Sequence, residues 1–368
     1  MKITNCTTKK EINDFLAFNI EHYKSSQLFV NPLLIALKKT FDIHKNPFWK
    51  QNYFAFFLLT NDNKSIGRIA CIINKKESNK IANFGFLECI DDFNASKLLF
   101  ESAENFAKNN NCTSISGPYN PSINYELGIL TSGFDKKPFF MMSYNFTFYD
   151  DLIKYNNYKK EQDFDSYLLN TQTFNDSKKL NTICSKYYKC KNLEIRNVDL
   201  KNIDSELKIL FEIYNNAFQN HFGFIPFEIE EFMFMGRDMA QIVNPKFLKI
   251  VFWKSQPAGF LLALPNINEV LEKIKNGKLF PFGIFKFLYF KNKVKSLRII
   301  NVAIHHKFVH LGLGAILYKS IYEEMKSKKI MNAQLSWIAE SNNDMQKIVA
   351  ELGAKKENIY RIYEKKLV

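Results

Sequence analysis

The stretch NVAIHHKFVHLGLGAILYKSIYEE, residues 301–324, decides the fold of this chain. An apolar run that suits a buried strand ends at Ile304, two histidines and a Gly-x-Gly follow, and apolar residues then recur at helical spacing from Ala315 to Met325. A helix N-terminus presents unpaired backbone N–H groups and a positive dipole, and glycines let an anion approach them closely. The stretch therefore predicts a strand, an anion-binding turn and a helix. A lone Gly-x-Gly is a weak signal, so a plain tight turn is the alternative interpretation.

The same order of elements occurs twice in the chain. In the first half a hairpin, a strand, a helix and a strand are expected at 53–74, 83–90, 94–110 and 112–120. The corresponding segments of the second half are 246–265, 298–304, 314–329 and 331–340, and each half then closes with a helix, a turn and a strand. The pattern predicts an α/β fold with mixed sheets in two tandem domains, 1–169 and 193–368, joined by a linker at 170–192. Coincidental alternation of strands and helices is the alternative.

Composition narrows the class of protein. The chain has 368 residues, 46% of them hydrophobic, which is enough for two packed cores. Its net charge is +14, but only five of the 51 basic residues are arginine, so the charge does not favour nucleic acid as a partner. An anionic cofactor or an anionic membrane surface stays a possible partner. No apolar core of a signal peptide follows the first lysines, and the apolar runs are shorter than a membrane span, so a cytoplasmic location is expected. The six cysteines form no C-x-x-C pair and have no histidines at zinc spacing, so no metal is expected.

The order of motifs in the second half is similar to that of a known family. A hairpin, a strand, the turn HLGLGA, a helix, a strand, ESNNDM, a helix with ELGAKK and the final strand IYRIYEKKL resemble the GNAT superfamily of acyl-CoA-dependent N-acyltransferases. The resemblance covers 193–368 well and 1–169 in outline. The motifs NPFW, GRIA, GPYNPSINYELGILTSGFD, NHFGFIPF, NGKLFPFG and RIYEKKL resemble a bacterial tandem-GNAT group that includes proposed sphingoid-base N-acyltransferases, or bacterial ceramide synthases.

The resemblance implies an acyl-CoA site in the second half, with coenzyme A as co-substrate. The glycine turn would hold the pyrophosphate, and the central strand would supply a backbone N–H to the developing oxyanion. The implied cofactor-binding residues are Val302, Ala303, Ile304, His310, Leu311, Gly312, Leu313, Gly314, Ala315 and Asn342.

Two positions of the second half and the turn of the first half depart from the family pattern. Val309 stands where the turn usually begins with Gln or Arg, and Val349 stands where a tyrosine often protonates the leaving thiolate. Tyr360 and Tyr363 are candidates for that proton only because they are close in sequence. In the first half, Asp91 and Asp92 replace the glycines and would repel a pyrophosphate, so this half is expected to have lost coenzyme binding.

Acyl transfer to an amine needs a group that takes the amine proton. Glu340, after the strand AQLSWIA, is the first choice, and capping of the next helix together with Ser341 is its alternative role. His305 is the second candidate, although His305 and the adjacent histidine also suit an exposed cofactor loop. The expected substrate-binding residues are Asn220 and His221, after the first helix of the second half, and Tyr125 and Glu126, in a first-half loop that would reach a shared cleft. Plain loop packing and turns are the alternatives for these four.

The sequence therefore predicts an N-acyltransferase that transfers an acyl group from acyl-CoA to a primary amine by direct attack. A lipid-like amine of the sphingoid type is one expected acceptor. A small-molecule N-acetyltransferase, a Fem-like transferase that uses aminoacyl-tRNA, and a non-catalytic binding module remain alternatives. In the segment 277–298 an aromatic stretch is followed by Lys291, Lys293, Lys295 and Arg298, which fits either core packing or contact with an anionic membrane at its inner face.

Overall fold

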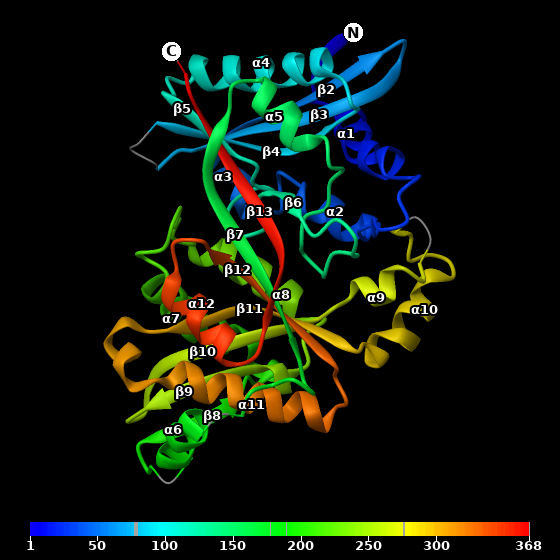
Figure 1. The fold of residues 1–368 in the computed structure, drawn as a ribbon. Coiled ribbons are helices and arrows are strands. Elements are labelled where there is room, and N and C mark those ends of the chain that lie inside the picture. Colours follow the sequence, from blue (N-terminus) through cyan, green and yellow to red (C-terminus); the bar gives the residue numbers. More distant parts are fainter. Residues whose placement is uncertain (77–79, 177, 189, 275–276, 368) are drawn as a thin grey trace. The chain divides into compact units, whose positions relative to one another are not determined.

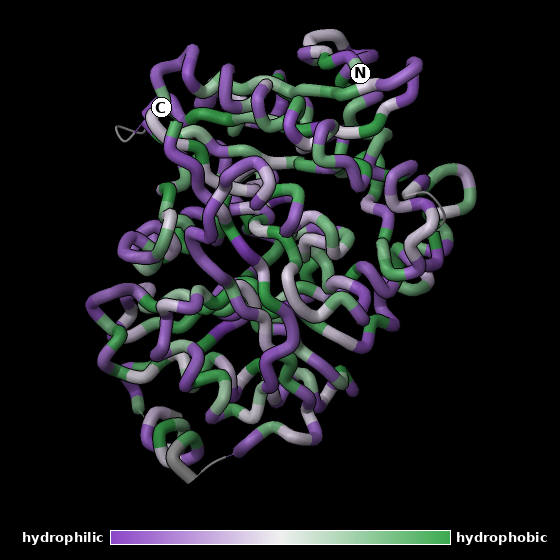
Figure 2. Tube along the Cα trace, turned by 45° about the horizontal axis from the view of Figure 1, so that its top comes forward, coloured by the Kyte–Doolittle hydropathy of each residue, from purple (hydrophilic) through white to green (hydrophobic). Residues whose placement is uncertain are grey.

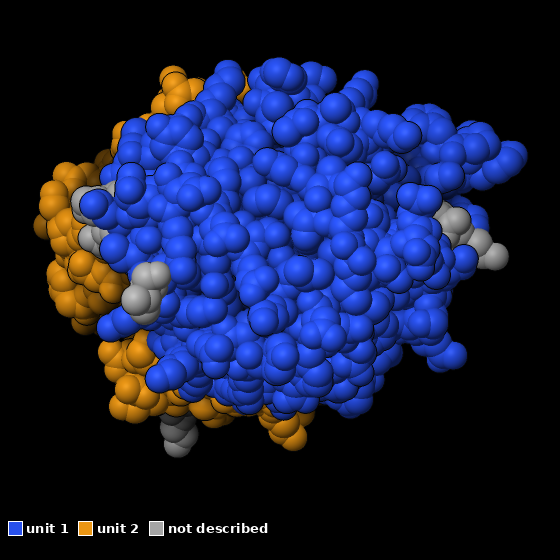
Figure 3. Space-filling view, turned by 90° about the horizontal axis from the view of Figure 1, so that it is seen from above, with its two compact units in different colours: residues 1–164, 271–287, 358–368 blue, residues 165–270, 288–357 orange. Residues whose placement is uncertain are grey.

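The computed structural model describes residues 1–76, 80–176, 178–188, 190–274 and 277–367. The chain forms two compact units (Figure 3). The first unit contains residues 1–164, 271–287 and 358–368, and the second contains residues 165–270 and 288–357.

The first unit is a mixed sheet with helices on its faces (Figure 1). Its strands are ordered β1-β2-β3-β4-β5-β13, where β2, β3 and β4 are an antiparallel meander, β4 and β5 are parallel, and β6 pairs with β13. The strands are β1 (Lys2–Asn5), β2 (Asn52–Asn61), β3 (Lys64–Asn74), β4 (Ile81–Cys89), β5 (Ser114–Gly117), β6 (Ile129–Ser132) and the last part of β13 (Lys355–Lys366). The helices are α1 (Lys9–His22), α2 (Leu34–Thr40), α3 (Pro47–Lys50), α4 (Phe93–Asn109) and α5 (Tyr149–Tyr155).

The second unit repeats this plan. Its strands are ordered β7-β12-β11-β10-β9-β8, with β11 and β12 parallel and the hairpin β9–β10 antiparallel to β11. The strands are β8 (Leu193–Asn197), β9 (Leu248–Trp253), β10 (Gln256–Pro265), β11 (Ser296–Ile304), β12 (Asn332–Ala339) and the last part of β7 (Lys159–Asn170). The helices are α6 (Lys178–Tyr188), α7 (Ile203–Ala217), α8 (Ile229–Ala240), α9 (Asn268–Leu271), α11 (Leu313–Ser327) and α12 (Asn343–Glu351), with short 3-10 turns η1 (Leu200–Asn202), η2 (Pro245–Phe247) and η5 (His306–Leu311).

The internal repeat predicted from the sequence is confirmed by this order. The segment β2-β3-β4-α4-β5 of the first half matches β9-β10-β11-α11-β12 of the second. The matched glycines occupy the same place in each ladder, since Gly67 lies opposite Cys89 and Gly259 lies opposite Ile304 at the ends of the two central strands.

Part of the closing strand of each half belongs to the other unit. Residues 358–366 of β13 lie in the first unit, where Tyr363 is opposite Gly117 of β5. Residues 165–170 of β7 lie in the second unit, where the Asn170 amide donates to Asn332 Oδ1 at 2.9 Å. The compact units therefore do not coincide with the predicted domains 1–169 and 193–368. Those domain boundaries stay a prediction that describes the two repeated halves of the sequence. Within the predicted linker 170–192, the structure has helix α6, and residues 177 and 189 lie outside the described residues.

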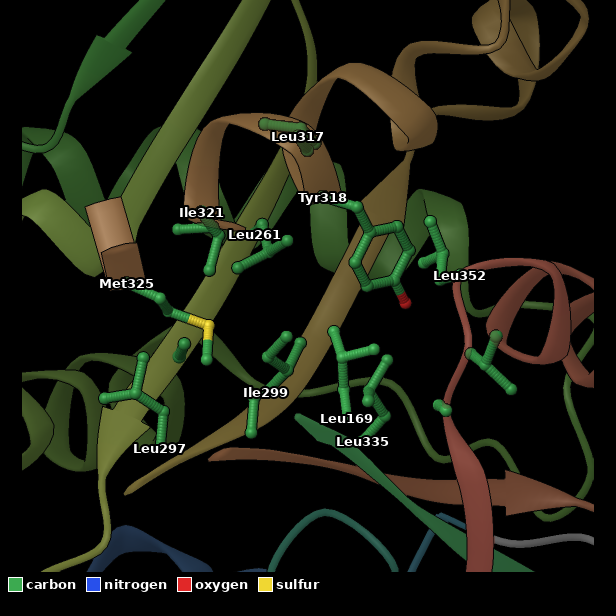
Figure 4. Packing of buried hydrophobic residues seen from close by; sticks show 14 of the residues in the cluster. Leu169, Leu261, Leu297, Ile299, Leu317, Tyr318, Ile321, Met325, Leu335 and Leu352 are labelled. Carbon is green, nitrogen blue, oxygen red and sulfur yellow. The ribbon is translucent and has the colours of Figure 1, made fainter. Parts of the chain in front are cut away.

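Helix α11 carries much of the core of the second unit. Its buried residues Leu313, Leu317, Ile321 and Met325 recur every four positions, so they share one face of the helix. Figure 4 shows Leu317, Ile321 and Met325 of this face packed against residues of the sheet. The sheet residues are Leu261, Leu297, Ile299 and Leu335. This packing fixes the N-terminus of α11 at the end of β11.

The first unit also buries a polar cluster. The Glu88 carboxylate accepts hydrogen bonds from the hydroxyls of Tyr23 (2.5 Å) and Tyr149 (2.7 Å), and Arg68 Nη2 lies 3.7 Å from it. Burial raises the pKa of Glu88. Because each of these groups has a partner on the same side of the sheet, the cluster holds α1 and α5 in place on the strands.

Hydrophobic and hydrophilic residues alternate over short distances along the trace (Figure 2). None of the helices within the described ranges combines the length and the apolar composition that crossing a membrane requires.

Candidate active site

Strands β11 and β12 separate at the centre of the second unit. Their parallel pairing runs from Ser296–Asn332 to Ile299–Leu335, although β11 continues to Ile304 and β12 to Ala339. Directly after the last pair, the ladder between β10 and β11 shifts register, and Ile300 is the extra residue of a bulge. Bulges of this kind often lie beside active sites, where they redirect a strand.

The predicted backbone donors lie beyond this separation. Val302, Ala303 and Ile304 follow the last β11–β12 pair, so the ladder to β12 does not use their backbone groups. The side chains of Val302 and Ile304 pack against the core under α11, and Ala303 is buried. Strand β11 is therefore fixed by the core at residues 302–304, whereas β12 does not pair with it there.

The glycine turn follows immediately. His310 and Leu311 end the 3-10 turn η5, and Gly312 has φ +67°, a left-handed conformation that favours glycine. Gly312 is the N-cap of α11, no side chain caps this helix, and its first turn contains no acidic residue. A Cβ added to Gly314 would meet no heavy atom within 4 Å beyond its helix backbone and chain neighbours. The helix end thus offers N–H groups and open space to an anion, which fits the pyrophosphate of coenzyme A.

The residues around this turn have distinct surroundings. Leu313 is fully buried in the core, whereas Ala315 only packs against it, so the two fix the first turn of α11. A Cβ at Gly312 would lie 3.9 Å from Ile183 of α6, a helix whose Leu180 and Cys184 belong to the same core. Exposed Val309, at the departure from the family pattern, adds no charge to the turn.

His305 and its neighbour form a small network with α7. The His305 N–H donates to Ala258 O at 2.9 Å, and His305 Nδ1 accepts from the Lys307 N–H at 3.3 Å. Burial, together with His306 and Lys307, lowers the pKa of His305. With Nδ1 accepting, the ring proton of neutral His305 lies on Nε2, which suits a donor better than a base.

Asn216 of α7 is a residue that the sequence interpretation missed. Its Oδ1 accepts from the backbone N–H of His306 at 2.9 Å and lies 2.7 Å from His306 Nδ1. It thereby ties helix α7 to the start of η5, the 3-10 turn that leads into the glycine turn. The predicted Asn220 and His221 lie exposed in the turn after α7, where the His221 ring meets Phe218 edge-on at 5.0 Å. Their contact with substrate stays a prediction.

The predicted base lies at the end of β12. Glu340 is exposed, and its backbone carbonyl accepts from Gln346 Nε2 at 3.0 Å. The cap of α12 is Asn342, whose Oδ1 accepts from the Met345 N–H at 3.1 Å. The helix cap therefore does not require the Glu340 carboxylate, and its role as the base stays a prediction.

The position of the family's tyrosine is apolar and closed. Val349 is fully buried in the core of the second unit. Tyr360 and Tyr363 are buried in the first unit, where the Tyr363 hydroxyl donates to Asp150 and burial raises its pKa. Tyr363 is thus committed to a structural bond.

The equivalent place in the first unit is occupied by the protein itself. Strands β4 and β5 pair from Ile81–Ser114 to Asn83–Ser116 and then separate, as β11 and β12 do. The loop after β5 fills this separation: the Tyr119 N–H donates to Phe84 O at 2.9 Å, and Asn120 Oδ1 accepts from the Phe86 N–H at 2.6 Å. A Cβ on Gly85 would lie 1.7 Å from Tyr119 O, so only glycine fits there.

The predicted first-half substrate residues belong to this loop. Glu126 O accepts from the Asn120 N–H at 2.8 Å, and the Tyr125 ring meets Phe48 edge-on at 5.7 Å. Both residues thus help to close the loop on its own unit, and their part in substrate binding stays a prediction.

The helix that follows β4 is also closed to an anion. Asp92 caps α4, with Oδ1 accepting from the Ala95 N–H at 2.8 Å. A carboxylate therefore occupies the position that the glycine turn leaves open at α11. Loop and cap together agree with the prediction that the first half has lost coenzyme binding.

Comparison with known proteins supports this geometry. A tandem GNAT protein from the clavulanic acid biosynthesis pathway superposes with a TM-score of 0.59 at 7% identity, covering 100% of this chain and 98% of that one. This chain has the tandem GNAT fold. The predicted resemblance and the α/β tandem architecture are confirmed.

Two relatives match this chain over nearly its whole length. Protein YghO of Escherichia coli (strain K12) is 29% identical over 370 residues, covering 98% of this chain and 94% of the relative. The bacterial ceramide synthase of Caulobacter vibrioides (strain NA1000 / CB15N) is 28% identical over 371 residues, covering 98% and 96%. No protein-family model matches the chain.

Replacing the predicted base tests its role directly. Glu340→Gln is expected to lower the acyl-transfer rate about 100-fold near neutral pH, which is the usual contribution of a general base. The loss should shrink as pH rises, because solvent then deprotonates more of the amine. Initial rates measured across pH check this, with Glu351→Gln on the exposed end of α12 as the control. A rate profile that matches the parent's would remove Glu340 as the base.

Proposed function

We propose that this chain is an acyl-CoA-dependent N-acyltransferase that acts on a primary amine. The observation that carries the proposal is the contrast between the two central strands. In the second unit the strands separate next to the N-terminus of α11, which is capped by Gly312 and has no acidic residue in its first turn. In the first unit the loop after β5 fills the strand separation, and the carboxylate of Asp92 caps α4.

The glycine turn and the first turn of α11 would hold the pyrophosphate of coenzyme A, which supplies the activated thioester. Backbone N–H groups of Val302–Ile304 would donate to the oxyanion that develops at the carbonyl. The amine attacks that carbonyl, a C–N bond forms, the C–S bond breaks, and Glu340 takes the amine proton. Coenzyme A leaves as a thiolate, to which the Nε2–H of His305 would donate a hydrogen bond.

Direct attack fits the cysteines of the described chain. Burial raises the pKa of Cys6 to about 11 and that of Cys89 to about 12, so neither offers a reactive thiolate. Cys71 and Cys184 are buried, and burial raises their pKa values as well. None of these four thiols thus offers a nucleophile for a covalent acyl-enzyme, which is not part of the proposed mechanism.

The acceptor we propose is a lipid-like amine of the sphingoid type. Similarity over 98% of the chain to a protein named bacterial ceramide synthase supports this choice, and so does the aromatic loop NHFGFIPF, residues 220–227, whose Phe227 packs beside Tyr214 of α7. The reaction would then occur in the cytoplasm at the inner face of the membrane.

Calorimetry and turnover test the proposal together. We expect coenzyme A, acetyl-CoA and palmitoyl-CoA to bind and bulk tRNA not to bind. With palmitoyl-CoA and sphinganine, mass spectrometry should detect the N-acyl product. Faster turnover of acetyl-CoA on a small soluble amine would replace the lipid acceptor with a small-molecule N-acetyltransferase. Binding of tRNA without coenzyme A would reject the proposal.

A further inference from the structure

An aromatic surface stands out from the rest of the described chain. In helix α10 (Gly283–Phe290) and the turn before it, five large apolar side chains are more than half exposed. They are Phe280 (71%), Phe282 (74%), Phe285 (69%), Leu288 (52%) and Tyr289 (61%). Other apolar residues with similar exposure, such as Met1, Tyr53 and Val309, are scattered in sequence. For these five residues the core-packing interpretation of the segment is wrong.

Helix α10 is apolar on both sides. Phe285, Leu288 and Tyr289 share an outward face at i, i+3 and i+4, whereas Ile284 and Phe287 on the opposite face are half-buried. The inward residues therefore anchor the helix, and the outward face has no polar residues of the kind that a solvent-facing surface helix carries. Lys286 is the charged residue of the helix, and its Nζ donates to Lys273 O at 3.2 Å.

Cations surround the aromatic surface. Residues 278–295 contain no aspartate or glutamate, and their five lysines are all exposed. These lysines are Lys278, Lys286, Lys291, Lys293 and Lys295. Lys293 Nζ lies 3.5 Å from the centre of the Tyr289 ring, so a cation and an exposed aromatic ring are held together.

We propose that residues 278–295 form a membrane-docking surface that inserts its aromatic side chains into the interface of an anionic bilayer. Exposed aromatic residues on a short helix gain free energy by leaving water at the boundary of the headgroups and acyl chains. The surrounding lysines, with no acidic residue among them, match the negative potential of anionic lipids. The same charge pattern would not favour a second copy of this segment, because lysines would face lysines.

The inference deepens the proposed function and rests on it for its purpose. A bilayer-bound enzyme would meet a long-chain acyl donor and a lipid amine without either of them crossing water. The binding to lipid itself does not require the acyl-transfer reaction, so the two can be tested separately.

Vesicle sedimentation of the full chain tests the surface. At low salt, the parent is expected to bind phosphatidylcholine vesicles that contain phosphatidylglycerol. Its affinity for pure phosphatidylcholine vesicles should be lower by about tenfold or more. Phe282→Ser with Phe285→Ser should weaken binding about tenfold or more at every salt concentration. Lys291→Gln with Lys293→Gln should weaken it mainly at low salt. Tyr155→Ser, an exposed aromatic on α5, is the matched control and should bind as the parent does.

The inference is wrong if the parent does not bind anionic vesicles at low salt, or if the double Phe variant binds them as tightly as the parent. It is also wrong if the parent forms a dimer that the double Phe variant disrupts and neither protein binds vesicles. Coenzyme A titration of the same variants separates the two proposals. Vesicle binding without coenzyme A binding would reject the proposed function and keep the surface, and the reverse result would reject the surface alone.

Discussion

Gly314→Glu is expected to weaken coenzyme A binding by well over tenfold, which corresponds to more than about 1.4 kcal/mol. The new carboxylate would enter the open space at the first turn of α11, where the proposed pyrophosphate lies, and the two negative charges would repel. Folding should be retained, because a Cβ at this position meets no atom within 4 Å and an acidic residue in a first helical turn complements the dipole. Calorimetry measures the binding and thermal unfolding measures the fold.

Two further substitutions at Gly314 separate charge from size. Gly314→Gln has nearly the same volume without the charge, and Gly314→Ala adds only a methyl group. We expect affinity to fall in the order Ala, Gln, Glu. If the Glu variant binds as the parent does, the turn does not hold the pyrophosphate. Gly312 is a less useful site for this experiment, because its φ of +67° would add backbone strain to any side chain.

Gly85→Ala is expected to destabilise the first unit by about 3 kcal/mol or more. The added Cβ would lie 1.7 Å from Tyr119 O, and a backbone carbonyl cannot rotate away as a side chain can. The loop would have to leave the strand separation and give up the bonds of Tyr119 to Phe84 and of Asn120 to Phe86. Denaturant unfolding should show an earlier first transition.

Gly314→Ala is the matched control for this experiment, because it makes the same chemical change where space is open. It should leave stability unchanged or slightly higher, since alanine favours a helix over glycine. Equal midpoints for the Gly85→Ala and Gly314→Ala variants would contradict the closed arrangement of the first unit.

Sequence reasoning reached the glycine turn because its signal is local. A strand ending at Ile304, a glycine that tolerates positive φ and the start of a helix follow within ten residues of one another. The role of Asn216 was not visible, because its bonds to His306 join residues 90 positions apart and asparagine is common along this chain. The exposure of Phe282 and Phe285 was equally undecided, since an apolar segment reads the same in a core and on a surface.

The sequence by itself determined the repeat, the order of strands and helices within each half, and the half that carries the glycine turn before a helix. These features depend on periodicity, on glycines and on the sign of nearby charges, which short stretches of chain carry. Only the tertiary structure decided that β13 pairs with β5 in the first unit, that the loop after Gly117 fills the separation of β4 and β5, and that α10 turns aromatic residues outward. Each of these depends on which distant segment satisfies a strand edge or covers an apolar face, and that competition among long-range contacts leaves no signature in the local pattern.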